Sequence, residues 1–179
     1  MTEQTACIFC RILENREKAS FVAQGSDAVA FLDIHPVNEG HTLVIPRKHA
    51  ASIGEVDEVA AVAMWSLARR VAGALRVSGL RCEAVNLFLS DGAAAGQEVF
   101  HSHLNVVPRW PGDGFEIKFP PHYGAAAERK TLDEIAGRLR AMRSTASTIS
   151  DAAASASARA VITVAPAWSA RPWIDTRAW

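Results

Sequence analysis

The segment from residue 96 to residue 109, Gly-Gln-Glu-Val-Phe-His-Ser-His-Leu-Asn-Val-Val-Pro-Arg, constrains the fold more than any other part of the chain. His101, His103 and Asn105 occupy alternate positions of an apolar, β-branched run. Alternate residues of a strand share one face, so the spacing predicts a strand with these side chains in a row, roughly 6.5 Å apart. The residues between them are expected to enter a core. A polar row on such a strand indicates a functional site, although a half-exposed strand with scattered polar residues fits the same pattern.

The composition limits the class of protein. The 179 residues suffice for one domain plus an extension, and the apolar fraction of 49% is ample for a core. Lys+Arg and Asp+Glu both number 19, so no overall charge favours a nucleic acid polymer or a membrane as partner. No run of about 18 apolar residues and no signal peptide is visible. Three cysteines, two of them in Cys-x-x-Cys, fit a reducing compartment. We therefore expect a cytoplasmic protein.

The hydrophobic pattern predicts an α+β fold with an antiparallel sheet. Apolar residues at three- and four-residue spacing indicate one long helix over residues 55–78. Strands are expected at 29–32, 42–45 and 83–90, after a short helix near the N-terminus. A further helix is expected over 131–143, with Thr131 and Glu134 as a possible capping box.

The amino-acid composition of the chain changes after residue 143. Residues 144–160 are almost entirely Ala, Ser and Thr, which is typical of a linker. Trp168, Trp173 and Trp179 follow in a tail that is also rich in Arg and Pro. We therefore expect a domain over 1–143 and a linker and tail over 144–179. The tail fits either a segment that docks on its own domain or a partner, or a disordered extension.

Several motifs together resemble the histidine triad family of nucleotide hydrolases and transferases, whose usual signature is His-x-His-x-His. They are the triad segment, the opening Cys7-Ile8-Phe9-Cys10, residues 30–36 and 40–49, and Gly-Asp-Gly-Phe at 112–115. The resemblance runs in order from about Cys7 to about Arg143. It implies a HIT-like fold, an antiparallel five-stranded sheet with one long and one or more short helices. It also implies a homodimer in which two sheets join into one.

The resemblance assigns catalytic roles within the triad segment. His103 matches the nucleophile that attacks the α-phosphate and becomes a nucleotidyl-imidazole, with its δ nitrogen donating to a backbone carbonyl near His101. An acceptor on the far nitrogen fixes the tautomer that such a nucleophile needs. His41 matches a histidine that supports the triad from behind, and Gln97 an amide that touches the phosphate or its bridging oxygen. The implied catalytic residues are His103, His101, Asn105, Gln97 and His41.

The resemblance also implies a nucleotide pocket. Asp33 matches the carboxylate that accepts hydrogen bonds from two ribose hydroxyls. Phe9, Phe31 and Ile34 resemble the apolar pocket for the base, although each fits a plain core position too. The implied nucleotide-binding residues are Phe9, Phe31, Asp33, Ile34, Ser90, Gln97, His103 and Asn105.

Two positions depart from the family pattern. Asn105 stands where the third histidine is usual, and Ser90 stands where many members have Asn. An amide can donate to a phosphate oxygen but cannot transfer a proton near neutral pH. If that histidine is an acid or base in the parent chemistry, hydrolysis here is expected to be slower by roughly 10²–10⁴-fold. The galactose-1-phosphate uridylyltransferase branch has Gln at this place, which favours transfer to an acceptor other than water.

A structural zinc site is also predicted. The Cys7-x-x-Cys10 spacing can bring both sulfurs to one metal, although a pair of small core residues is an alternative. In bacterial family members that open this way, two histidines complete the site, and they match His49 and His101. A Cys₂His₂ tetrahedron suits structural Zn²⁺.

The leading hypothesis is a zinc-containing nucleotide hydrolase or nucleotidyl transferase. Its expected substrates are purine nucleotide conjugates: phosphoramidates, dinucleoside polyphosphates, and acyl- or sulfo-nucleotides. One alternative is a nucleotide-binding protein of the same fold, catalytically impaired by Asn105 and Ser90. Another is a partner-binding protein that uses its Trp-rich tail.

Overall fold

The computed structural model describes residues 7–142, and the chain divides into two units between Lys118 and Phe119. The predicted linker and tail at 144–179 lie outside the described residues. The predicted domain boundary at 143 falls inside the second unit.

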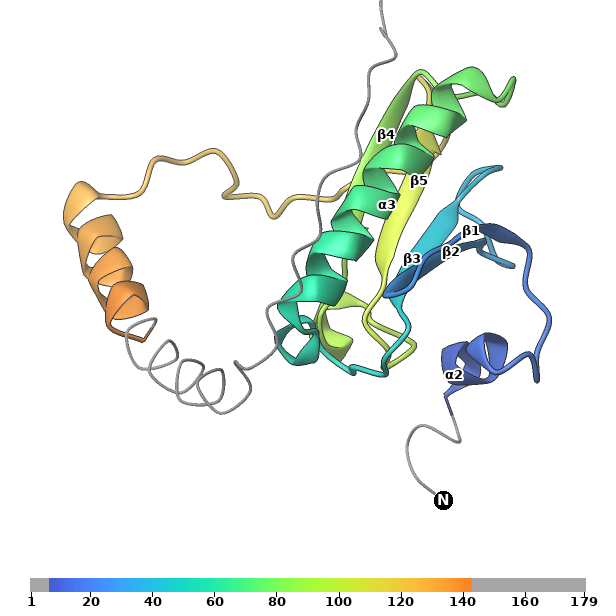
Figure 1. The fold of residues 1–179 in the computed structure, drawn as a ribbon. Helices are drawn as coiled ribbons and strands as arrows, with labels where there is room; N and C mark the ends of the chain where they lie inside the picture. Colours follow the sequence, from blue (N-terminus) through green and yellow to red (C-terminus); the bar gives the residue numbers. More distant parts are fainter. Residues whose placement is uncertain (1–6, 143–179) are drawn as a thin grey trace, which may run out of the picture. The chain divides into compact units, whose positions relative to one another are not determined.

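The first unit is built on an antiparallel sheet with the strand order β1-β2-β3-β5-β4 (Figure 1). The expected α+β class with a five-stranded antiparallel sheet is confirmed. The elements in chain order are α2 (Ile8–Leu13), β1 (Phe21–Gln24), β2 (Ala28–Leu32), β3 (Thr42–Pro46), η1 (Ile53–Glu55), α3 (Glu58–Val77), β4 (Ala84–Leu89), η2 (Ala93–Ala95) and β5 (Leu104–Arg109).

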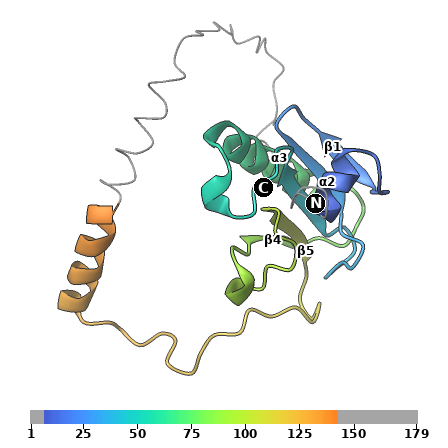
Figure 2. The ribbon, with the colours of Figure 1, turned by 90° about the horizontal axis from the view of Figure 1, so that it is seen from below.

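The long helix α3 covers one face of the sheet, as Figures 1 and 2 both show. The Asp57 side chain caps its start by accepting a hydrogen bond from the backbone N–H of Ala60 at 2.9 Å. The helix ends before Gly79, whose positive φ of 83° suits glycine. Its buried residues recur at three- and four-residue spacing and pack on alternate residues of the strands. Leu104 and Val106 belong to this core, as the sequence predicted.

The opposite face of the sheet carries the short helix α2. Phe9 and Ile12 of α2 pack on the alternate strand residues Val29, Phe31 and Leu43. The rings of Phe9 and Phe31 meet edge to face with centroids 5.5 Å apart. Because side chains alternate along each strand, Asn105 points to this second face while its neighbours enter the α3 core.

The strand that carries the polar row is shorter than predicted. It begins at Leu104, so His101 and His103 precede it. The backbone N–H of Ser102 donates to the carbonyl of Ala50, and that of His101 to the carbonyl of Val99. Because of these bonds, the backbone of residues 101 and 102 does not pair with the neighbouring strands. Pairing begins at Leu104, which lies opposite Val44 of β3 and Leu89 of β4. The prediction of one continuous strand was wrong here, and the two histidines are free to serve different sites.

The described part of the second unit, residues 119–142, contains a helix over 129–142. The predicted helix is therefore present, but it begins before Thr131, so a capping box at Thr131 and Glu134 is not its start. The rings of Phe119 and Tyr123 stack with centroids 4.0 Å apart. Among all described residues, no helix is long and apolar enough to cross a bilayer.

Candidate functional site

A cavity of about 510 Å³, called here the main cavity, opens on the sheet face opposite α3. It is lined by side chains from α2, β2, β3, β4 and the segment leading into β5. Seven of the eight predicted nucleotide-binding residues line it, namely Phe9, Phe31, Asp33, Ile34, Ser90, His103 and Asn105, and so does His41, which was predicted as a catalytic residue. A cavity of this size is within the usual range for small-molecule sites.

His103 is held in one tautomer by the backbone. Its Nδ1 lies 2.8 Å from the carbonyl oxygen of His101. A carbonyl oxygen only accepts, so Nδ1 carries the hydrogen and Nε2 keeps its lone pair in the neutral ring. The half-buried ring lies edge to face with Phe9 at 5.5 Å and lines the main cavity. An imidazole with a pinned far nitrogen is suited to nucleophilic attack.

His41 and Asn105 form a buried pair in the wall of the main cavity. His41 Nε2 lies 3.0 Å from Asn105 Oδ1, and the backbone N–H of Val37 donates to His41 Nδ1 at 3.3 Å. The amide of Asn105 in turn donates to the carbonyl of Phe88 at 3.2 Å. Burial lowers the pKa of His41, against smaller opposite effects from Asn105 and Asp33. A neutral His41 that accepts at Nδ1 and donates from Nε2 satisfies both of these hydrogen bonds, and one N–H of Asn105 remains for a ligand.

Asp33 and Ile34 lie where β2 ends. Asp33 Oδ1 accepts a hydrogen bond from the backbone N–H of His35 at 2.9 Å. Its other oxygen lies 3.5 Å from His41 Nδ1, and the carboxylate lines the main cavity. The Ile34 side chain is 80% exposed, so it forms part of the rim of the main cavity and is not a core residue.

Gln97 differs from its predicted position, because it does not line the main cavity. Its side chain is buried, and its Oε1 accepts from the backbone N–H of Gly92 at 2.7 Å. Its Nε2 donates to the carbonyls of Ala51 and Val99, at 2.7 and 3.1 Å. With its oxygen and both amide hydrogens used by main-chain groups, Gln97 braces the loop and has no donor left for a phosphate.

Cys7, Cys10, His49 and His101 form a second cluster, called here the Cys–His cluster, with all four ligand atoms within 4.8 Å of one another. Cys10 Sγ lies 3.3 Å from His49 Nδ1, and both sulfurs lie 3.6 Å from His101 Nδ1. The Cys-x-x-Cys turn at the start of α2 brings the sulfurs together. The predicted metal-ligand set is thus brought together in one place.

The donor chemistry of the Cys–His cluster fits a zinc ion. His101 Nε2 donates to the carbonyl of Pro46 at 2.9 Å, so the lone pair on Nδ1 faces the sulfurs. Burial lowers the pKa of His101 to about 4, which keeps the imidazole neutral. Burial is the largest cause, and the neighbouring Cys7 thiol the second, that raises the pKa of Cys10 to about 11. A thiolate there therefore needs a cation, and two thiolates with two neutral imidazoles are a zinc ligand set.

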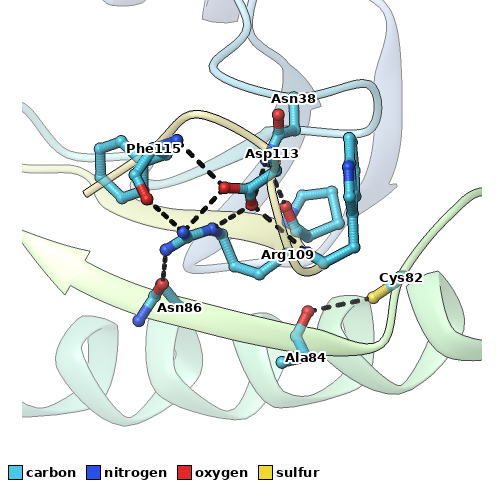
Figure 3. A network of polar contacts seen from close by, with 9 residues as sticks. Asn38, Cys82, Ala84, Asn86, Arg109, Asp113 and Phe115 are labelled. Carbon is cyan, nitrogen blue, oxygen red and sulfur yellow. Dashed lines mark hydrogen bonds and ion pairs between the residues drawn. The ribbon is translucent and has the colours of Figure 1, made fainter.

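A polar network holds the segment that follows β5. Figure 3 shows Arg109 between Asp113, Asn86 and Phe115. Arg109 donates to both carboxylate oxygens of Asp113, at 2.5 and 3.0 Å, and its guanidinium lies over the Phe115 ring at 4.6 Å. The Phe115 ring stacks on Phe88, which lines the main cavity and accepts the hydrogen bond from the Asn105 amide. The network therefore supports one wall of the cavity.

This network predicts an acid-dependent contribution to stability. The Asp113 side chain is only 3% exposed, and the Arg109 hydrogen bonds hold its pKa well below the usual range. A depressed folded-state pKa stabilises the fold above the unfolded value of about 4 and loses that effect as pH falls further. Asp113→Asn is expected to lower the urea midpoint at pH 7, and the gap to the unchanged protein is expected to shrink at pH 3. An equal gap at both pH values would contradict this reading.

Some cavity residues were missed by sequence reasoning. Glu17, Lys18, His35, Phe88 and Glu98 also line the main cavity. None of them forms a motif, because charged residues in turns look the same in sequence whether they face solvent or a cavity rim. Phe88 was visible only as one member of an alternating strand.

The comparisons with known proteins agree with this geometry. The family model for the HIT domain matches residues 14–112. A HIT family protein from Bacillus anthracis is 33% identical, with a TM-score of 0.70 over 76% of this chain and 96% of that one.

Two further solved structures bear on the sites. A Zn-bound histidine triad family protein from Mycobacterium smegmatis is 36% identical, with a TM-score of 0.60 over 66% of this chain and 85% of that one. A hypothetical histidine triad nucleotide-binding protein from Sulfolobus tokodaii is 30% identical, with a TM-score of 0.56 over 69% of this chain and 78% of that one.

Proposed function

The chain belongs to the HIT domain family, and from that premise we propose that it cleaves purine nucleotide conjugates at the α-phosphate through a nucleotidyl group carried on His103. Nucleotide-binding hydrolases and transferases are typical of this family. The similarity to a nucleotide-binding relative supports the ligand class.

The first step is a displacement at phosphorus. The lone pair of His103 Nε2 attacks the α-phosphorus, the bond to the leaving group breaks, and its electrons leave with that group. The N–H at Nδ1 keeps its hydrogen bond to the His101 carbonyl throughout. The partial negative charge of that oxygen stabilises the positive charge that develops on the imidazole ring. This hydrogen bond on the cavity wall is the observation that carries the proposal.

The remaining cavity residues suit a nucleotide in one orientation. Phe9, Phe31 and Ile34 offer an apolar surface for a purine, and Asp33 offers acceptors for the ribose hydroxyls. Ser90 and the spare N–H of Asn105 are donors for the phosphate oxygens. Gln97 has no place in this scheme, because its amide is used by the main chain.

The Cys–His cluster would hold a structural zinc ion through Cys7, Cys10, His49 and His101. The ion would supply a fixed charge and rigid geometry, not substrate contact. His101 links the two sites, because its ring faces the cluster while its carbonyl orients His103. A homodimer stays a proposal, and light scattering of the purified protein would test it.

The direct test is product analysis with a panel of adenylate and guanylate phosphoramidates, dinucleoside polyphosphates and acyl-nucleotides. The proposal expects release of the nucleoside monophosphate from at least one class. Binding of AMP or GMP without any product would favour the second candidate, an impaired nucleotide-binding protein. That candidate rests on Asn105, whose amide cannot transfer a proton.

Restoring the third histidine is expected to speed hydrolysis. Asn105→His places a group that can transfer a proton beside His103, and such groups are worth roughly 10²–10⁴-fold. The measurement is the steady-state rate of monophosphate release. Asn105→Gln is the matched control, because it keeps an amide and should give no gain. An unchanged rate in Asn105→His would show that the third position does not limit turnover.

A further inference from the structure

Release of the nucleotidyl group from His103 needs a base, and the usual third histidine is absent. Asn105 cannot accept a proton, and both ring nitrogens of His41 are engaged by Val37 and Asn105. Asp33 already accepts from the His35 backbone and faces His41. The Glu17 carboxylate lies 3.3 Å from the Arg11 guanidinium.

Glu98 is the carboxylate on the cavity wall that stays available. It lines the main cavity together with Gly96, Val99 and His103, all from the segment that leads into β5. Its side chain is exposed, and within residues 7–142 no hydrogen bond or ion pair engages its carboxylate. His35 also lines the main cavity, but it follows Asp33 and Ile34 on the part of the wall assigned to ribose and base.

The backbone around Glu98 is held in place. The buried Gln97 side chain bonds to Gly92 on one side and to Val99 on the other. Its bond to Ala51 ties the same loop to the segment after β3. Glu98 also lines a second cavity of about 500 Å³, together with Cys7 and His49, so open space borders this residue on two sides. The Glu98 carboxylate is thus an unengaged acceptor on a braced loop, on the same cavity wall as His103, and a general base needs such a group near the reacting atoms.

We propose that Glu98 is the catalytic base that activates water to release the nucleotidyl group from His103, an inference that rests on the proposed function. The water oxygen attacks phosphorus while its proton passes to the Glu98 carboxylate. The bond from phosphorus to His103 Nε2 breaks, and its electrons return to the ring, which becomes neutral again with its hydrogen on Nδ1. Glu98 then gives the proton to bulk water.

The test separates formation of the adduct from its decay. The full chain is mixed with adenosine 5′-phosphorimidazolide, whose leaving group needs no help, and the adduct is followed by intact mass spectrometry after an alkaline quench. In Glu98→Gln the adduct is expected to form at an unchanged rate and to decay roughly 10²–10⁴-fold more slowly. Glu83→Gln, at an exposed site outside the cavity, should behave as the unchanged protein.

A second variant distinguishes a base from a structural group. In Glu98→Ala, added formate should restore decay in proportion to its concentration, because a small carboxylate can occupy the vacated space. Equal decay in Glu98→Gln and the unchanged protein, or no effect of formate on Glu98→Ala, would overturn the inference while leaving the proposed function intact. No adduct in any of the proteins would contradict the proposed function and, with it, the inference.

Discussion

A protein in which His103 is replaced by alanine is expected to lose turnover by on the order of 10⁴–10⁶-fold, the scale seen when a nucleophile or its partner is removed from a hydrolase. The reason is specific to one atom. Three histidines of the described chain line the main cavity, and of these His41 has both nitrogens engaged, while His35 lies on the part of the wall assigned to the ribose and base. His103 presents a free Nε2 because its other nitrogen donates to the His101 carbonyl.

The measurement is single-turnover release of the nucleoside monophosphate, with AMP binding followed by calorimetry. His122→Ala is the matched control, because His122 is an exposed histidine in the second unit. Near-normal AMP binding with lost turnover would assign His103 to chemistry. Turnover within a few-fold of the unchanged protein would show that another group attacks phosphorus.

Loss of one sulfur from the Cys–His cluster is expected to remove bound zinc and to lower the melting temperature by roughly 10 °C or more. A ligand present at 1,000 times its Kd stabilises a fold by about 4 kcal/mol, and each kcal/mol shifts the melting temperature by roughly 2–8 °C in domains of this size range. Cys10→Ser should show this loss most clearly. Cys10 is buried and its sulfur lies within 3.6 Å of two histidine nitrogens.

Zinc content by elemental analysis and thermal unfolding, each with and without a chelator, measure this effect. Cys82→Ser serves as the control, since its sulfur lies outside the cluster and donates to the carbonyl of Ala84. If the chelator leaves the melting temperature of the unchanged protein where it was, the cluster does not hold a stabilising metal.

Regular hydrophobic spacing made much of the fold predictable. The long helix was predictable because its apolar residues recur every three or four positions. Strands β2, β3 and β4 were predictable from their apolar, β-branched or alternating residues, which pack in the core. The strand β1 was not located in the sequence, because its four residues are all exposed or half-buried and carry little pattern. The start of β5 was also missed, since the hydrogen bond from the Ser102 N–H to the distant Ala50 carbonyl holds the backbone away from the sheet until Leu104.

The sequence predicted which residue types belong to the two sites, but not what surrounds each side chain. His103 and Asn105 line the main cavity, and His101 lies in the Cys–His cluster. For Gln97 the amide could equally serve a ligand or the backbone, and only the fold decides between them. Glu98, next to it, looked like an ordinary surface acid, because nothing in a single sequence distinguishes a cavity rim from open solvent.

Mass mapping of the chain after mixing with an activated adenylate shows which residue receives the nucleotidyl group. The protein is quenched under alkaline conditions, digested, and the modified peptide is located by tandem mass spectrometry. We expect one adenylyl group, attached to His103, that is absent from His103→Ala. An adenylyl group on a different residue, or product release with no modified peptide at any time point, would contradict this expectation.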